Sequence, residues 1–341
     1  MDRIFKSLLI TVLISLASIC IVLWFTEGTD DLRYLAEVDP LYIILAMAFH
    51  AGSWVLWSAR MKILTRATGG EISFLKSFQI LLSSLFAAGI TPSEVGGEPV
   101  KIFLLSEEAK GDMSLGDATA VVVTERFLDV IFLVLISPLG IIIFRGHVLS
   151  SGLIVIPIIA VAFFVTVFSI LILIMYRPDV IKVIMNRIFE VILRVWKSER
   201  MKRLLKRIDE ELGSFIKGMW IIAKNKYELV LASGCTVARW LMDLCVAPLI
   251  LIGLGSAPNM VHSFAAQILL IVLLLVPITP GGSGIAEISS AAIFSTFVKD
   301  IPMVPFVFLF RFVTFYFNLI LGAVISVIIL KDIKLLRRLL E

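Results

Sequence analysis

The feature that most constrains this chain is a series of apolar blocks of about 20 residues. A helix of about that length crosses the hydrocarbon core of a bilayer, which is about 30 Å thick. With 59% hydrophobic residues and a mean hydropathy of +1.02, the sequence predicts an all-α polytopic membrane protein. The predicted blocks are 4–26, 40–59, 72–90, 118–144, 152–176, 228–252, 263–278, 285–298 and 302–330.

The charges between the blocks predict the orientation in the membrane. The acidic loop from Glu27 to Asp39 is typical of the outer face, whereas the segment 177–226 carries thirteen bases against six acids and is predicted to be cytoplasmic. The basic tail after Leu330 is expected on the same side. Because the first block is read as a retained span, the sequence predicts a multi-pass plasma-membrane protein with cytoplasmic N- and C-termini.

These assignments conflict if every block crosses the membrane, so two segments are expected to turn back. We predict a re-entrant hairpin near 72–105 that enters from the cytoplasm, and a second near 263–298 that enters from outside. In this topology 25 of the 31 Lys and Arg are inside, three are outside, and Arg126, Arg239 and Arg311 lie within the membrane. This charge bias favours the two hairpins.

An internal repeat relates the two expected hairpins. The stretches QILLSSLFAAGITPSEVG (79–96) and QILLIVLLLVPITPGGSG (267–284) agree at nine of eighteen positions without a gap. Further along, Arg126-Phe127 has a counterpart in Arg311-Phe312. The sequence therefore predicts a single membrane domain, 1–341, with two halves, 40–145 and 228–330, that are inverted relative to each other. Inverted repeats with broken helices are the architecture of many secondary transporters.

Proline and glycine interrupt the apolar runs at the centre of each repeat. A broken helix frees backbone groups that cost several kcal/mol each in lipid, so such breaks occur beside protein or a watery cavity. We therefore expect the two motifs to mark a polar cavity, although Pro and Gly can also simply kink packed helices. The predicted helix breaks are Thr91, Pro92, Thr279 and Pro280.

Charged side chains within the predicted spans are the candidate substrate contacts, because a charge at membrane depth usually faces a cavity or a partner. A guanidinium group fits phosphate bidentately, which favours phosphate contact for Arg126 and Arg311, and free N–H groups after Gly97 and Gly284 would add to the attraction. Mutual neutralisation of acids and bases is the structural alternative. The charged candidates are Glu94, Glu98, Glu125, Arg126, Asp129, Arg239, Asp243, Glu287 and Arg311, and Gly97 and Gly284 are added for the N–H groups that follow them.

The segment 177–226 has apolar residues at helical spacing with bases between them. It predicts a basic amphipathic helix on the anionic cytoplasmic leaflet, or a solvated helix pair that links the halves. The membrane explains its basic excess, so nucleic acid is not an expected partner. Three scattered histidines, His50, His147 and His262, are interpreted as lying near helix ends without a ligand role, and no metal or cofactor is predicted.

Three ordered motifs resemble those of the lysylphosphatidylglycerol synthase/flippase transmembrane family, which includes the flippase half of bacterial multiple peptide resistance factors. They are TPSEVGGEPVKIFLL (91–105), ERFLD (125–129) and TPGGSGIAE (279–287). The resemblance implies about eight helices with re-entrant elements that move lipid headgroups between leaflets. It adds Gly96, Lys101, Gly281 and Gly282 to the candidate site, and Lys101 stands where the family usually has arginine. The soluble aminoacyl-transferase domain of the resistance factors, and hence aminoacyl-lipid synthesis, is not expected.

The leading functional hypothesis is a lipid flippase or translocase that moves phospholipid or polyprenyl-phosphate-type headgroups through a central polar cavity. Phosphate-bearing membrane lipids are then the partners, and Glu98 and Glu287 would contact amines or carry protons. A second hypothesis is an ion-coupled transporter of a small soluble anion. A third is a membrane enzyme acting on lipid phosphates or a non-catalytic partner of one, but the sequence has no P-loop or DxD pair, which favours a non-enzymatic role.

Overall fold

The computed structural model describes residues 33–91, 96–111, 113–144, 199–274 and 282–340, together with the single residues 166, 169, 176 and 187. The predicted first span, 4–26, lies outside the described residues, as do all but three residues of block 152–176. Five residues of the predicted breaks and site also lie outside them, namely Pro92, Glu94, Thr279, Pro280 and Gly281.

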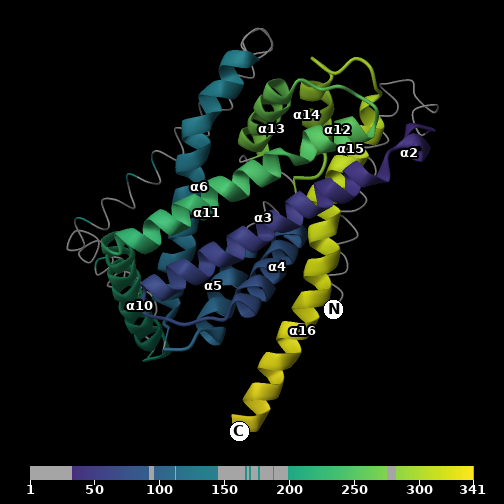
Figure 1. Ribbon diagram of the computed structural model, residues 1–341. Helices are drawn as coiled ribbons and strands as arrows, with labels where there is room; N and C mark the ends of the chain where they lie inside the picture. The colour runs from purple at the N-terminus through teal and green to yellow at the C-terminus, as the bar shows by residue number, and fades with distance from the viewer. Residues whose placement is uncertain are drawn as a thin grey trace.

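The chain is all-helical over the described ranges, which contain no strand (Figure 1). In chain order the elements are α2 (Arg33–Glu37), α3 (Pro40–Ala67), α4 (Phe74–Ile90), α5 (Gly97–Glu108), α6 (Leu115–Ile143), α10 (Glu199–Lys224), α11 (Lys226–Leu244), α12 (Val246–Gly253), α13 (Met260–Leu274), α14 (Ile285–Phe294), α15 (Met303–Arg311), the π-helix η2 (Phe312–Tyr316) and α16 (Phe317–Leu340).

Local sequence signals explain where the two central helices, α3 and α6, begin. Asp39 precedes α3 and accepts a hydrogen bond from a first-turn N–H, while Pro40 occupies the first helical position, where its missing N–H costs nothing. Ser114 and Asp117 form a reciprocal capping box at the start of α6. These caps fix the starts of the helices that carry Arg60, Glu125, Arg126 and Asp129, which are described below.

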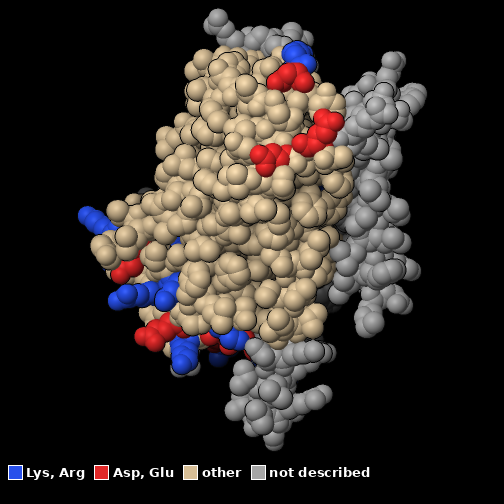
Figure 2. All heavy atoms as spheres, turned by 45° about the vertical axis from the view of Figure 1, so that its right-hand side comes forward, with Lys and Arg blue, Asp and Glu red and all other residues tan. Residues whose placement is uncertain are grey.

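Within the described ranges, three helical stretches are long and apolar enough to span a membrane. They are Pro40–Ala67, Lys226–Gly253 and Met303–Ile329, with 28, 28 and 27 residues, against the roughly 20 that a bilayer requires. Figure 2 shows the same property on one face of the molecule, where a broad band without charged side chains separates charges gathered at its two ends. The prediction of an all-helical protein is confirmed over the described residues, and these contain helices able to span a membrane.

The course of α3 corrects the predicted block 40–59, because the helix continues to Ala67. The sequence interpretation placed Arg60 among the cytoplasmic bases. In the structure Arg60 lies inside this helix with a fully buried side chain. A charge ends an apolar run in the sequence, but in the fold two acids of α6 neutralise it.

Two apolar cores lie along α3. One contains residues of α12, α13, α14 and α15 with Ala46 of α3, and the other contains residues of α4, α5, α6 and α10 with α3 from Trp54 to Ala67. In Figure 1, α13 and α14 lie toward one end of α3, whereas α4 and α5 lie toward its other end. The cavity with the candidate site residues lies between these two groups of helices.

Two pairs of short helices, α4 with α5 and α13 with α14, contact each other within each pair. They have 17, 12, 15 and 10 residues, fewer than the roughly 20 that a membrane span requires. Most of the residues that join each pair lie outside the described ranges. The lengths agree with re-entrant hairpins, but the hairpins and the inverted repeat stay predictions.

Helix α10 forms the described part of the predicted amphipathic segment. Its apolar side chains are buried in the core that also contains residues of α6, and they include Phe215, Ile216 and Met219. The two helices approach closely, since the Gly116 N–H donates to the Glu211 carboxylate at 2.6 Å. Much of the apolar face therefore packs on α6, and contact of this segment with the anionic leaflet stays a prediction.

Candidate functional site

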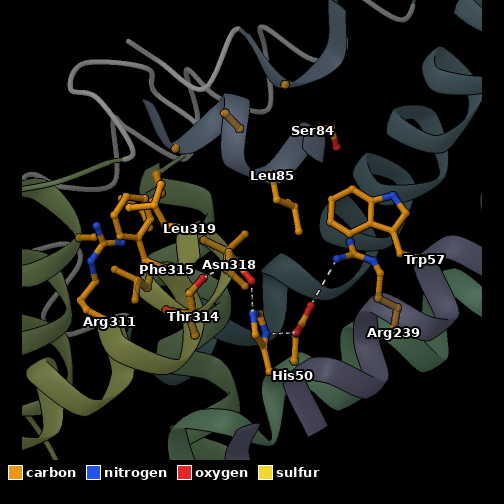
Figure 3. A pocket seen from close by; sticks show the side chains of 18 of the residues that line it. His50, Trp57, Ser84, Leu85, Arg239, Arg311, Thr314, Phe315, Asn318 and Leu319 are labelled. Carbon is orange, nitrogen blue, oxygen red and sulfur yellow. Dashed lines mark hydrogen bonds and ion pairs between the residues drawn. The ribbon is translucent and has the colours of Figure 1, made fainter. Parts of the chain in front are cut away.

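A cavity of about 530 Å³ lies between the two cores and receives side chains from both predicted halves. Figure 3 shows Trp57 and Arg239 on one side, Arg311 and Phe315 on the other, and His50 between them. Six of the predicted site residues line it: Gly97, Glu98, Arg126, Arg239, Asp243 and Arg311. The two halves thus contribute charges to one shared space.

The other candidates of the first half that the structure describes lie beside this space. Lys101, Glu125 and Asp129 are buried, with at most 3% of each exposed. Gly96 precedes α5, and its N–H donates to the Thr91 hydroxyl at 2.9 Å. Thr91 therefore ends α4 and also holds the start of the next helix against it.

The second motif forms a tight turn into α14. Gly282 and Gly284 have φ angles of +64° and +91°, a backbone conformation that favours glycine. The Gly284 N–H donates to Glu287 at 2.7 Å, so Glu287 caps its own helix. The free N–H groups were expected after Gly284, and there the Ala286 N–H is not free, because it donates to the Gly282 carbonyl oxygen at 2.9 Å.

Asp129 is the centre of a buried charge cluster. Arg60 donates to its two oxygens at 2.7 and 3.1 Å, and Arg239 donates at 2.8 Å. The Trp240 indole N–H adds a bond at 3.1 Å, and Glu125 accepts from Arg60 at 3.3 Å. Because both Asp129 oxygens are occupied and the cluster joins α3, α6 and α11, the geometry favours the structural alternative for Asp129.

Trp57 lies among the cations of this cluster and was not predicted. The distance from its ring centroid is 4.5 Å to the Arg239 guanidinium, 4.6 Å to the Lys101 ammonium and 5.5 Å to the Arg126 guanidinium. An indole face attracts cations at such distances. Lys101 also donates to Glu125 at 3.3 Å, so its charge has both an anionic and an aromatic neighbour.

In each predicted half, one arginine–glutamate ion pair joins the short helix that follows the Pro-Gly motif to the next helix in the chain. Arg126 of α6 pairs with Glu98 of α5, with the Nε donating at 2.7 Å, and Arg311 of α15 pairs with Glu287 of α14, with the Nε donating at 2.9 Å. The pairs differ in exposure. The side chain of Arg126 is 49% exposed, whereas that of Arg311 is 7% exposed and that of Glu287 is fully buried.

His50 corrects the interpretation of the histidines. It lies within α3, lines the cavity and contacts two other helices. Its Nδ1 is 2.9 Å from an Asp243 oxygen on α11, and its Nε2 is 3.0 Å from the Asn318 amide oxygen on α16. A polar residue inside the apolar run LAMAFHAG was the only sequence signal for this contact.

Among the described residues, no group of three or more His, Cys, Asp or Glu side chains is arranged to hold a metal ion. Cys235 and Cys245 are free thiols. The cavity therefore offers paired charges, one histidine and apolar walls to whatever enters it.

Helices able to span a membrane and a charged internal cavity define a polytopic membrane protein with a buried polar site. Residues 8–322 match the family of the lysylphosphatidylglycerol synthase TM region, and the chain belongs to this family. The match confirms the resemblance that the three motifs indicate.

Archaeal membrane proteins are similar to this chain along most of its length. A UPF0104 membrane protein of Archaeoglobus fulgidus is 28% identical over 93% of this chain and 95% of its own. One of Methanothermobacter thermautotrophicus is 26% identical over 82% of each chain, and one of Pyrococcus horikoshii is 24% identical over 95% of this chain and 97% of its own. No solved structure matches the chain.

Proposed function

We propose that this protein is a flippase or translocase that moves phosphate-bearing lipid headgroups between leaflets through the cavity. The observation that carries the proposal is the lining of that cavity, where guanidinium groups from both predicted halves face one space of about 530 Å³: Arg126, Arg239 and Arg311. A volume of this order suits a small polar ligand. Membership of the lysylphosphatidylglycerol synthase TM region family supports a role connected with membrane lipids.

Arg126 is the group best placed to receive a phosphate, because nearly half of its side chain is exposed. Glu98 Oε2 has no hydrogen-bond partner among the described residues and lies 3.8 Å from the Lys101 ammonium. A phosphate can therefore replace Glu98 on Arg126 while Glu98 shifts toward Lys101. No charge is left unpaired by this exchange, which avoids the main cost of breaking an ion pair away from water.

Arg311 offers the corresponding contact in the second half, but it is buried against Glu287 and Ser283. The difference in exposure suits alternating access, in which only one of two equivalent groups is open at a time. In this proposal Arg126 holds the headgroup in the state described here. Arg311 holds it after the halves have moved.

The membrane arrangement belongs to the same proposal. The short pairs α4–α5 and α13–α14 lie toward opposite ends of α3 (Figure 1), which supports two hairpins that enter from opposite sides. The charge bias of the sequence supports an orientation with both termini in the cytoplasm and the segment 177–226 beside the anionic leaflet of the plasma membrane.

Apolar side chains complete the cavity wall. Leu270, Leu274, Phe315 and Leu319 line it. They give a surface compatible with the start of an acyl chain, while the rest of the tails stays in lipid. Exchange between leaflets breaks no covalent bond, so the proposal requires neither a catalytic group nor a cofactor.

The test is leaflet exchange in liposomes that contain the purified protein. A fluorescent phospholipid in the outer leaflet is bleached by a reductant that does not cross the membrane, and the exchange rate is measured. The variant Arg126→Ala/Arg311→Ala should lower the rate about tenfold or more, because charged hydrogen bonds worth about 1.5–3 kcal/mol are lost. The control Arg66→Ala/Lys299→Ala removes two exposed charges outside the cavity and should keep the wild-type rate.

Equal rates for the wild type and Arg126→Ala/Arg311→Ala would contradict the proposal. Uptake of labelled inorganic phosphate into the same liposomes, without lipid exchange, would instead favour a transporter of a small soluble anion.

A further inference from the structure

His50 contacts two helices of the second predicted half from its place within α3. Both ring nitrogens are engaged, Nδ1 by Asp243 at 2.9 Å and Nε2 by Asn318 at 3.0 Å, and only 8% of the residue is exposed. Figure 3 shows the ring between these two contacts, with dashed lines to both. The residue thus joins α3 to α11 and α16 at the cavity wall.

The orientation of the Asn318 amide is fixed by a second bond. Its Nδ2 donates to the Thr314 carbonyl at 2.6 Å, so the atom that faces His50 is the amide oxygen. On the other side of the ring, the Asp243 carboxylate also accepts from Arg239 at 3.3 Å. Both ring nitrogens therefore face acceptors.

A neutral imidazole has one N–H and one lone pair, so it can satisfy only one of two acceptors. The Arg239 guanidinium that donates to Asp243 favours an ionised carboxylate there, which has no proton to give to the ring. With a single ring proton, either the Asp243 or the Asn318 contact would then bring two lone pairs to within about hydrogen-bond distance. Turning the Asn318 amide over would relieve this, but it would place its oxygen against the Thr314 carbonyl. We propose that His50 is a proton-binding site of the cavity and holds a second ring proton as an imidazolium.

The groups around His50 support a bound proton. From α11, Asp243 supplies the adjacent negative charge and Arg239 lies behind it, itself bound to Asp129 of α6. The neighbours from α16, η2 and α13 are uncharged: Asn318, Thr314 and Gln267, whose side-chain amide donates to the Asp243 carbonyl. On α3 itself the Trp54 ring lies edge-on at 5.2 Å.

The proton changes the charge balance of the site. Among the residues that the structure describes, the buried and cavity-lining charges form two equal sets, which are the cations Arg60, Lys101, Arg126, Arg239 and Arg311 and the anions Glu98, Glu125, Asp129, Asp243 and Glu287. A proton on His50 therefore makes the set net positive, and in a low-dielectric interior this attracts an anionic group. The proton also holds the two predicted halves together, so its release would loosen α3 from α16.

This inference deepens the proposed function, since it makes the proton the partner of the anionic headgroup. The proton enters and leaves as a proton, and no other bond forms or breaks. The protonation of His50 can nevertheless be measured without any transport.

The test is ¹⁵N NMR of histidine-labelled protein in lipid nanodiscs at neutral pH. The chain has three histidines, and the signal that disappears in His50→Gln identifies His50. Both ring nitrogens of His50 should show the signature of protonated nitrogen. Asn318→Asp, which keeps an acceptor, should preserve that signature, whereas Asn318→Leu, which removes it, should yield the neutral ring.

A His50 ring with one protonated nitrogen in the wild type would overturn the inference. Transport in a pH gradient gives the second readout, since lipid exchange should respond to the gradient in the wild type and not in His50→Gln. An imidazolium signal without any lipid exchange would keep the proton site and overturn the proposed function. Lipid exchange with a neutral His50 would keep the proposed function and overturn the proton site.

Discussion

Arg60 of α3 and Asp129 of α6 form a two-pronged ion pair in the interior of this membrane protein, with N–O distances of 2.7 and 3.1 Å. Neither side chain is more than 4% exposed. This ion pair joins α3 to α6, and the bond from Arg239 to Asp129 joins α11 to the same group. Because buried charges without partners are costly, the stability of the fold depends on this pair.

Removal of either side chain of this ion pair should therefore strongly destabilise the folded protein. Arg60→Met is expected to destabilise the protein by about 3–5 kcal/mol, since Asp129 and Glu125 lose a shared cation. Thermal unfolding in detergent measures this loss. Lys62→Met, on an exposed position of the same helix, is the control and should change stability little. Asp129→Asn combined with Arg60→Met should cost less than the sum of the two single changes, and strict additivity would contradict the pairing.

Close packing of α16 on α4 gives a second prediction. A Cβ added to Gly322 would lie 2.5 Å from the Leu82 carbonyl oxygen, so Gly322→Ala must push the two helices apart, at a cost of about 1–3 kcal/mol. Gly234→Ala is the matched control, because nothing lies within 4 Å of its added Cβ. Unfolding temperatures should fall for the first variant and stay equal or rise for the second. Equal temperatures for both variants would show that α4 and α16 are not in this contact.

The second motif depends on Glu287 as a helix cap. Glu287→Gln should weaken both the bond from Gly284 and the pair with Arg311, so amide hydrogen exchange in the first turn of α14 should accelerate. Glu228→Gln changes a partly exposed acid in the first turn of α11 and should leave exchange in α14 unchanged. If amide exchange in α14 were unchanged in Glu287→Gln, Glu287 would not be the cap of this helix.

Glu98 should compete with an anionic ligand for Arg126. Glu98→Gln removes that competing charge, so binding of a phosphate-bearing lipid should tighten several-fold, whereas Arg126→Ala should weaken it. Native mass spectrometry with titrated lipid measures both. Glu107→Gln, an exposed acid on the same helix, controls for the change in net charge. Weaker binding in Glu98→Gln would mean that Glu98 itself holds the ligand.

Sequence patterns predicted most of the described helices because blocks of apolar residues have one stable form in a membrane. Most of the described charged candidates also proved to lie at or beside the cavity, since a charge inside an apolar block must find a partner. Arg60 was missed for the opposite reason. Its charge appeared to end a block, and only the fold shows that the helix continues.

The remaining contacts could not be predicted because they join residues far apart in the chain. Asp129 meets Arg239, 110 positions later, and His50 meets Asn318, 268 positions later. Single polar residues such as Trp57 and Asn318 carry no periodic signal. Their role follows only from the helices that bring them to the same cavity.

A structure determined in nanodiscs that contain a phosphorylated lipid tests the central claim most directly, which is that the cavity receives a phosphate-bearing headgroup. Density for a phosphate within hydrogen-bond distance of the Arg126 guanidinium is the predicted result. Well-resolved lipids around the protein with a cavity that holds only water, and Glu98 still on Arg126, would contradict it.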